Sequence, residues 1–144
     1  MKKKILFITE RRADYSKLRP IIKEIKNSNN LEYFLVVTGS HLIKKHGYTI
    51  NEIKKDDIKI HKKFRMFPRN SKNTHDEMTL AFGKAITNMT KIIKELKPDI
   101  VFTGFDIGAN FAAAIVGAHM NIHVAHLEGG EVTGTIDESI RHAI

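Results

Sequence analysis

The sequence contains no cysteine among its 144 residues, so a disulfide framework and a cysteine-based metal site are both excluded. It also lacks any apolar run that approaches the roughly 20 residues of a membrane-spanning helix. The basic N-terminus precedes a short apolar run, 5–8, which is soon followed by Glu10, Arg11 and Arg12. A secretory signal peptide needs roughly 7–15 apolar residues, so that interpretation is rejected as well. We therefore expect a cytoplasmic protein without a membrane partner.

The net charge of +8 invites a nucleic-acid interpretation. The lysines, however, are scattered in small groups and show no basic groove with interleaved aromatic residues. They are typical of solvated faces, so no nucleic-acid partner is expected. A positive field would also suit an anionic sugar nucleotide. The groups in question are 2–4, 44–45, 54–55 and 62–63.

Strand and helix patterns alternate along the chain, whose length suits one domain spanning residues 1–144. Apolar runs with β-branched residues predict strands, and apolar residues at helical spacing predict helices between them. This order implies an α/β fold, a Rossmann-like parallel sheet with helices on both faces. Ligands of such folds bind at the carboxyl ends of the strands. The predicted strands cover 4–9, 31–38, 58–64, 100–103 and 122–126, and the predicted helices lie around 18–25, 48–57, 74–96, 107–120 and 137–144.

The helix that begins after the predicted loop 66–73 has the clearest boundaries. Thr74 and Glu77 match a capping box, and Pro98 ends the helix. One apolar face is predicted to consist of Met78, Phe82, Ile86, Met89, Ile93 and Leu96.

Two strand ends carry residues suited to binding an anionic ligand. The loop after the first strand opens a helix, whose N-terminus suits phosphate, and Arg12 and Lys17 add positive charge there. No GxGxxG or Walker motif occurs, so a capped helix with solvated charges is the alternative. After the second strand, Gly39 fits a tight turn, and either Ser40 or His41 is a candidate to face a ligand. The alternative there is a plain turn.

Acidic residues follow the last two predicted strands. Asp106 comes after the fourth, and a glycine-rich loop after the fifth carries the others. Neighbouring carboxylates raise one another's pKa, which suits general acid and base catalysis. The alternatives are a helix cap for Asp137 and a plain surface position for Glu131. No HExxH or EF-hand spacing occurs, so no metal site is predicted. The charged residues near this loop are His126, Glu128, Glu131, Asp137, Glu138, Arg141 and His142.

Three segments, 12–18, 38–42 and 126–144, closely resemble the hydrolysing UDP-N-acetylglucosamine 2-epimerases. The last, HLEGGEVTGTIDESIRHAI, is the most specific, and the likeness covers essentially the whole chain. Non-hydrolysing relatives carry Glu-Ala-Gly-Leu-Arg where this chain has Glu128 to Val132, which favours the hydrolysing branch.

The resemblance implies the N-terminal domain of a two-domain, glycosyltransferase-B-like enzyme whose active site lies between the domains. The C-terminal nucleotide-binding domain would be absent from residues 1–144, so the chain alone is expected to be inactive. The implied reaction converts UDP-N-acetylglucosamine and water to N-acetylmannosamine and UDP, for sialic-acid-type sugars, by elimination and then hydration. No cofactor is implied, and the full-length enzyme would be a homo-oligomer. Alternatives are an epimerase for another amino sugar, such as diacetylated bacillosamine, and a non-catalytic binding domain.

Carried over residue by residue, the family's catalytic acids fall on Asp106, Glu128 and Asp137. The family usually has Gly-Asp-Arg around the first acid, so the placement of Asp106 rests on its spacing from Glu128. The glycine often found after Thr9 is here Glu10. The residues predicted to bind the nucleotide sugar are Arg12, Lys17, Ser40, His41, Glu131, Arg141 and His142.

Overall fold

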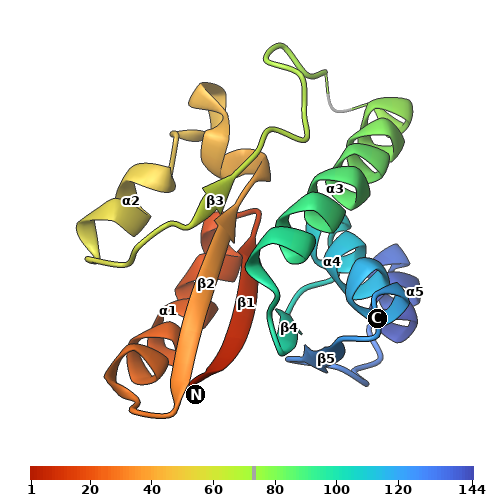
Figure 1. Cartoon of the computed structure of the whole chain (residues 1–144). Helices are drawn as coiled ribbons and strands as arrows, with labels where there is room; N and C mark the ends of the chain where they lie inside the picture. Colours follow the sequence, from red (N-terminus) through yellow and green to blue (C-terminus); the bar gives the residue numbers. More distant parts are fainter. Residues whose placement is uncertain (73) are drawn as a thin grey trace.

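A computed structural model describes residues 1–72 and 74–144, so Asn73 of the predicted loop 66–73 lies outside the described residues. The described residues form one five-stranded parallel sheet in the order β3-β2-β1-β4-β5 (Figure 1). The strands are β1 Lys3–Thr9, β2 Leu31–Val37, β3 Lys62–Lys63, β4 Ile100–Thr103 and β5 His123–His126. The helices are α1 Arg12–Asn27, α2 Ile50–Lys55, α3 His75–Leu96, α4 Gly108–His119 and α5 Ile136–Ala143, with the 3-10 turns η1 Gly39–Leu42 and η2 Lys44–His46 between β2 and α2.

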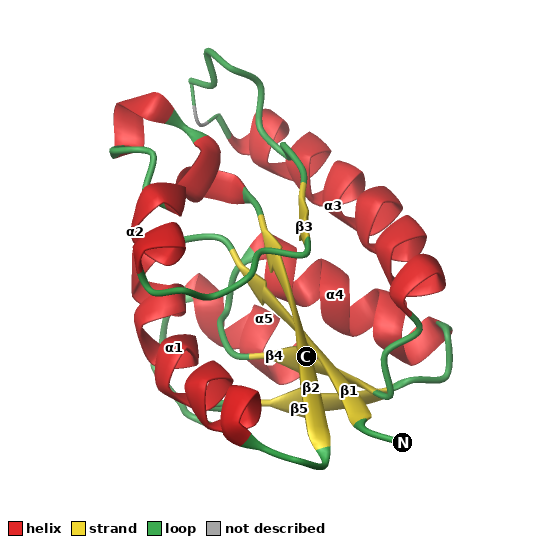
Figure 2. Ribbon diagram, turned by 60° about the vertical axis from the view of Figure 1, so that its left-hand side comes forward, coloured by secondary structure: helices red, strands yellow, loops and turns green. Residues whose placement is uncertain are grey.

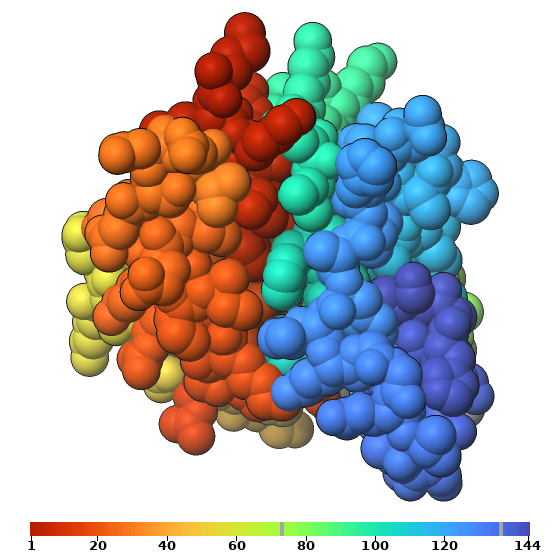
Figure 3. Space-filling view, turned by 90° about the horizontal axis from the view of Figure 1, so that it is seen from below, coloured from red at the N-terminus to blue at the C-terminus, as the bar shows by residue number. Residues whose placement is uncertain are grey.

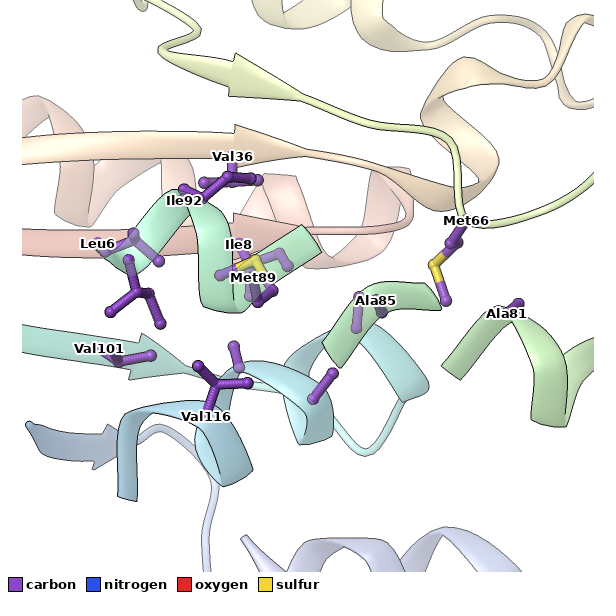
Figure 4. Close-up of a cluster of buried hydrophobic side chains, with 14 residues drawn as sticks. Leu6, Ile8, Val36, Met66, Ala81, Ala85, Met89, Ile92, Val101 and Val116 are labelled. Carbon is purple, nitrogen blue, oxygen red and sulfur yellow. The ribbon is translucent and has the colours of Figure 1, made fainter. Parts of the chain in front are cut away.

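Helices cover both faces of the sheet, with α1 and α2 on one side and α3 and α4 on the other (Figure 2). Successive side chains of β1 pack alternately into the helix layers on the two faces of the sheet, as expected for a central strand. Leu6 and Ile8 pack in the α3–α4 layer, whose core Figure 4 shows, whereas Ile5 and Phe7 pack against α1 and α2. The Rossmann-like fold predicted from the strand and helix alternation is therefore confirmed.

Small residues let α4 lie close to the sheet. A Cβ atom added at Gly117 would stand 3.0 Å from the Val124 side chain and 3.2 Å from that of Val101. The helix thus packs directly over β4 and β5. This packing places the start of α4 next to the carboxyl end of β4.

The structure corrects two details of α3 and one of the sheet. Within the described residues the Thr74 hydroxyl makes no capping hydrogen bond, and Glu77 accepts hydrogen bonds from Ser71 Oγ and Lys72 N, each at 2.8 Å. The capping box is therefore wrong, although the helix begins where it was predicted. Met78 of the predicted apolar face is 53% exposed. The third strand pairs over only two residues rather than over 58–64.

The order of the strands reverses between β1 and β4, because β2 lies on one side of β1 and β4 on the other. Such a switch point opens a crevice at the carboxyl ends of the strands. Helix α5 lies beside the segment around residues 120–130, across the molecule from the segment around 50–60 (Figure 3). None of the helices in the described ranges is long and apolar enough to cross a membrane.

Candidate active site

Lys17 and Glu128 form an ion pair between α1 and the loop after β5. The Lys17 ammonium donates to both carboxylate oxygens of Glu128, at 2.6 and 2.7 Å, although 111 residues separate the two. Lys17 also lies over the ring of Phe105, 5.7 Å from its centre, in the loop after β4. The side chains of Lys17 and Glu128 are 49% and 39% exposed, so a ligand can reach both. The ends of β4 and β5 and the start of α1 therefore meet at one place.

Asp106 and Arg141 form a second ion pair. Asp106 directly follows Phe105, the residue whose ring Lys17 contacts. Arg141 Nε donates to Asp106 Oδ2 at 2.9 Å, and its Nη2 donates to the same oxygen. Arg141 Nη1 also donates to the carbonyl of Glu131 at 2.8 Å and to Thr133 Oγ1 at 3.3 Å. One buried guanidinium thus holds Asp106, the glycine-rich loop and α5 together.

His126 ends β5 close to this second pair. Its Nε2 atom is buried and has no hydrogen-bond partner in the part of the chain that the structure describes. Burial lowers the pKa of His126, although the charge of Asp106 acts in the opposite direction. The ring packs against Gly129, where an added Cβ would stand 2.8 Å from Nδ1. A neutral imidazole therefore borders the acids, and the sequence had indicated only that His126 is near them.

Asp137, Glu131 and His142 are exposed on α5 and the loop before it. Thr135 occupies the N-cap position of α5, so the interpretation of Asp137 as its cap is wrong. The carboxylate that holds this turn belongs to Glu138, which accepts hydrogen bonds from the backbone of residues 133 and 134. Asp137 precedes Arg141 by four residues, so the two lie on the same side of the helix.

His41 and Ser40 lie in η1, after β2. His41 is fully buried, and its ring nitrogens contact Thr9 Oγ1 at 2.9 Å and Thr49 Oγ1 at 2.7 Å. Burial lowers the pKa of His41 to about 4. A ligand would have to replace one of these hydroxyl contacts to reach the ring. Ser40 is half-buried, and the substrate contact predicted for this pair stays a prediction.

The motif at the start of α1 is held by a buried aspartate. Asp14 accepts hydrogen bonds from Glu10 N at 3.2 Å, Arg11 N at 2.9 Å and Arg11 Nε at 3.2 Å. Tyr15 donates its hydroxyl to Asp56 at 2.9 Å. Both residues therefore support the local structure, while Arg12 stands exposed at the first position of the helix, available to a ligand.

Glu10 is the buried acid at the switch point, a role that the sequence motifs did not reveal. Only 7% of it is exposed, and its Oε2 accepts a hydrogen bond from Ala109 N in the first turn of α4 at 3.0 Å. Burial raises the pKa of Glu10 to about 7, and the hydrogen bond from Ala109 opposes that rise. The sequence offered one hint of this role: Glu10 stands where the resembling family often has a glycine after Thr9.

A basic hollow lies on the same edge of the sheet, after β2 and β3. It has a volume of about 720 Å³, and its positively charged lining residues are Lys44, Lys45, Arg65 and Arg69. The acids stand instead at the ends of β4 and β5. No group of three or more His, Cys, Asp or Glu side chains among the described residues is placed to hold a metal ion.

Comparison with known proteins shows the family to which the chain belongs. The family model for UDP-N-acetylglucosamine 2-epimerase matches residues 23–144. The chain belongs to this family. A Legionella pneumophila protein named UDP-N,N'-diacetylbacillosamine 2-epimerase (hydrolyzing) is 39% identical over 100% of this chain and 38% of its own length. The UDP-N-acetylglucosamine 2-epimerase of Neisseria meningitidis is 37% identical over 99% of this chain and 36% of its own.

Solved structures of the family share the fold. A crystal structure of a UDP-N-acetylglucosamine 2-epimerase superimposes with a TM-score of 0.84 at 22% identity, over 99% of this chain and 39% of that one. The chain thus spans less than two fifths of the length of each of these three proteins.

Proposed function

We propose that residues 1–144 are the N-terminal domain of a hydrolysing UDP-N-acetylglucosamine 2-epimerase. The full-length enzyme would convert UDP-N-acetylglucosamine and water to N-acetylmannosamine and UDP. The observation that carries this proposal is the meeting of two acid–base pairs, Lys17 with Glu128 and Arg141 with Asp106, at the ends of adjacent strands. The location in the cytoplasm stays a prediction from the sequence.

The reaction has two steps, each of which needs proton transfer. In the elimination, a base removes the proton from C2, the bond from C1 to the diphosphate oxygen breaks, and a double bond forms between C1 and C2. In the hydration, water adds its hydroxyl at C1 while a base takes the other proton of the water, and an acid delivers a proton to the other face of C2. Several carboxylates in different surroundings divide such tasks.

The surroundings of each acid suit it to a different part of this chemistry. Glu128 is exposed beside a cation, so Lys17 is placed to exchange its partner for an anionic substrate group. Asp106 is held by two guanidinium nitrogens, which keep its orientation. Asp137 is exposed on α5 and reaches solvent. We propose these three as the catalytic acids, with Arg12 and Lys17 near the diphosphate.

A second amino sugar is an alternative substrate. The 39% identical Legionella relative is named for UDP-N,N'-diacetylbacillosamine. Both sugars present the same C1 and C2 chemistry, so the same acids would serve either one.

The isolated chain should show negligible turnover, because a site between two domains needs both walls to exclude water and hold the diphosphate. The test joins residues 1–144 to the remainder of the Neisseria relative and measures UDP release from each nucleotide sugar. Proton NMR of the product then assigns the configuration at C2. Release of UDP together with a product inverted at C2 supports the proposal. A folded chimera that binds the nucleotide sugar and leaves it intact counts against it, as does turnover at an enzymatic rate by the isolated chain.

A further inference from the structure

Glu10 connects three of the loops that follow the strands. Its carbonyl accepts a hydrogen bond from His41 N in η1 at 3.3 Å, and its N–H donates to Asp14 Oδ2 in α1 at 3.2 Å. Its side chain crosses the switch point to Ala109 N in the first turn of α4, at 3.0 Å. A residue directly after β1 therefore contacts η1, α1 and α4.

The carboxylate of Glu10 lies where this fold usually receives a ligand. The N-terminus of a helix at a switch point attracts anions through its free N–H groups and its dipole. Here the chain supplies that anion itself, through the carboxylate of Glu10. Gly39 leaves the room for it, because a Cβ at Gly39 would overlap Glu10 Cγ.

The loop that carries Asp106 leads directly into the start of α4. Ala109 follows Asp106 by three residues, and Asn110 Oδ1 accepts a hydrogen bond from Gly104 N at 3.1 Å, which closes the loop on itself. Arg141 holds the outer side of Asp106, whereas Glu10 holds the inner end of the same loop. Three residues of backbone thus connect the Glu10 contact at Ala109 to Asp106.

We propose that Glu10 is a positioning residue whose ionised carboxylate anchors the α4 N-terminus and sets the place of Asp106, and whose protonation loosens that anchor. The catalytic role of Asp106 in this statement rests on the proposed function. The coupling from Glu10 through Ala109 to Asp106 does not.

Neighbouring charges decide when Glu10 takes up its proton. Burial is the largest influence and raises its pKa to about 7, with a smaller rise from the charge of Asp14. The N–H of Ala109 and the charge of Arg11 favour the ionised form. His41, which packs from η1, is neutral in this range, and the first turn of α4 carries no acidic residue. The anchor should therefore change state near neutral pH.

The experiment follows backbone amide resonances of the 144-residue chain by NMR from about pH 5 to about pH 9. The amide proton of Ala109 should move downfield as Glu10 ionises, with a midpoint near 7, and the Asp106 amide should move with the same midpoint. Both transitions should vanish in Glu10→Gln. They should persist in Glu138→Gln, a matched loss of one carboxylate that accepts backbone hydrogen bonds elsewhere.

Three results would overturn the proposal: a flat Ala109 resonance in the wild-type chain, a transition that survives Glu10→Gln, or an Asp106 amide that ignores the Ala109 transition. Should Glu10→Gln fail to fold, the wild-type chain alone still tests the proposal. In it, the resonances of the Glu10 side-chain carboxyl carbon and of the Ala109 and Asp106 amides must share one pH midpoint. In the full-length chimera, Glu10→Gln should remove the matching inflection from the pH profile of kcat. Absence of UDP release in the wild-type chimera would count against the proposed function and leave the NMR result standing.

Discussion

Arg141 Nε donates a hydrogen bond to Asp106 Oδ2 at 2.9 Å, and this contact joins α5 to the loop after β4. Arg141→Lys should lower the melting temperature of the 144-residue chain by several degrees. A lysine ammonium lacks the planar fork that reaches Asp106, Glu131 and Thr133 together, and it leaves a half-buried carboxylate poorly paired. Thermal unfolding followed by circular dichroism measures the effect.

Lys26→Met provides the matched control for Arg141. Lys26 pairs with the exposed carboxylate of Asp57, and exposed pairs contribute little to stability. Its melting temperature should stay close to that of the wild type. Equal losses in the two variants would show that the contacts of Arg141 are no stronger than those of a surface pair.

The pH dependence of stability should separate Glu10 from His41. The raised pKa of Glu10 contributes stability that is fully present below about 4.5 and is lost as the pH rises through about 7. The lowered pKa of His41 contributes stability that is present above 6.5 and is lost as the pH falls through about 4. The two contributions oppose each other between pH 4.5 and 6.5 in the wild type.

Glu10→Gln should remove the Glu10 contribution to the pH dependence of stability and leave that of His41. Its stability relative to the wild type should rise by on the order of 3 kcal/mol between about pH 4.5 and pH 8, from about 1.4 kcal/mol for each pKa unit. Urea unfolding at several pH values gives this difference directly. A difference that does not change with pH would show that the buried carboxyl titrates at its ordinary value.

Two glycines should respond in opposite directions to alanine. Gly39 has a φ of +59°, and a Cβ there would overlap Glu10, so Gly39→Ala should destabilise the chain by at least about 1–2 kcal/mol. Gly83 lies in the exposed interior of α3, where an added Cβ would meet no atom of the described residues within 4 Å. Gly83→Ala should stabilise it by about 0.5–1 kcal/mol. Denaturant unfolding measures both, and a neutral Gly39→Ala would mean that Glu10 readily leaves the crevice.

The layered fold was predictable because each element carries its own local signal. Apolar runs with β-branched residues mark β1 and β2, and apolar residues at helical spacing mark the helices between the strands. Local signals failed where a competing partner exists nearby. Glu77 bonds Ser71 and Lys72 rather than completing a capping box. The third strand is an edge strand whose pairing among the described residues is with β2, so the strand predicted over 58–64 yields a two-residue ladder.

Site contacts depend on partners far apart in the sequence, which spacing does not reveal. The positions of Lys17 and Glu128 after strand ends indicated that both lie at the same edge of the sheet. Their direct ion pair, across 111 residues, is a tertiary contact that the spacing does not predict. The contact of Glu10 with Ala109 spans 99 residues and follows from the switch point between β1 and β4. His41 looked like a ligand-facing residue from its position after a strand. Its two threonine partners come from the end of β1 and from the start of α2, which lie far apart in the sequence.

The final prediction concerns the three proposed acids in the chimera with a second domain. Asp106→Asn, Glu128→Gln and Asp137→Asn should each reduce kcat for UDP release by at least about 10²-fold. An amide keeps the shape of the carboxyl group but does not shuttle a proton, and a positioned acid or base is typically worth about 10²–10⁴-fold. Initial rates of UDP release and melting temperatures are measured for each variant.

Glu24→Gln, on the exposed side of α1, is the matched control and should leave the rate unchanged. Melting temperatures distinguish lost chemistry from lost structure, since Asp137 does not occupy the cap position of α5 and its replacement should leave stability almost unaltered. Normal rates in both Asp106→Asn and Glu128→Gln would overturn the catalytic assignment. A normal rate in Asp137→Asn alone would remove that exposed residue from the proton transfers and leave the two strand-end acids to divide elimination and hydration between them.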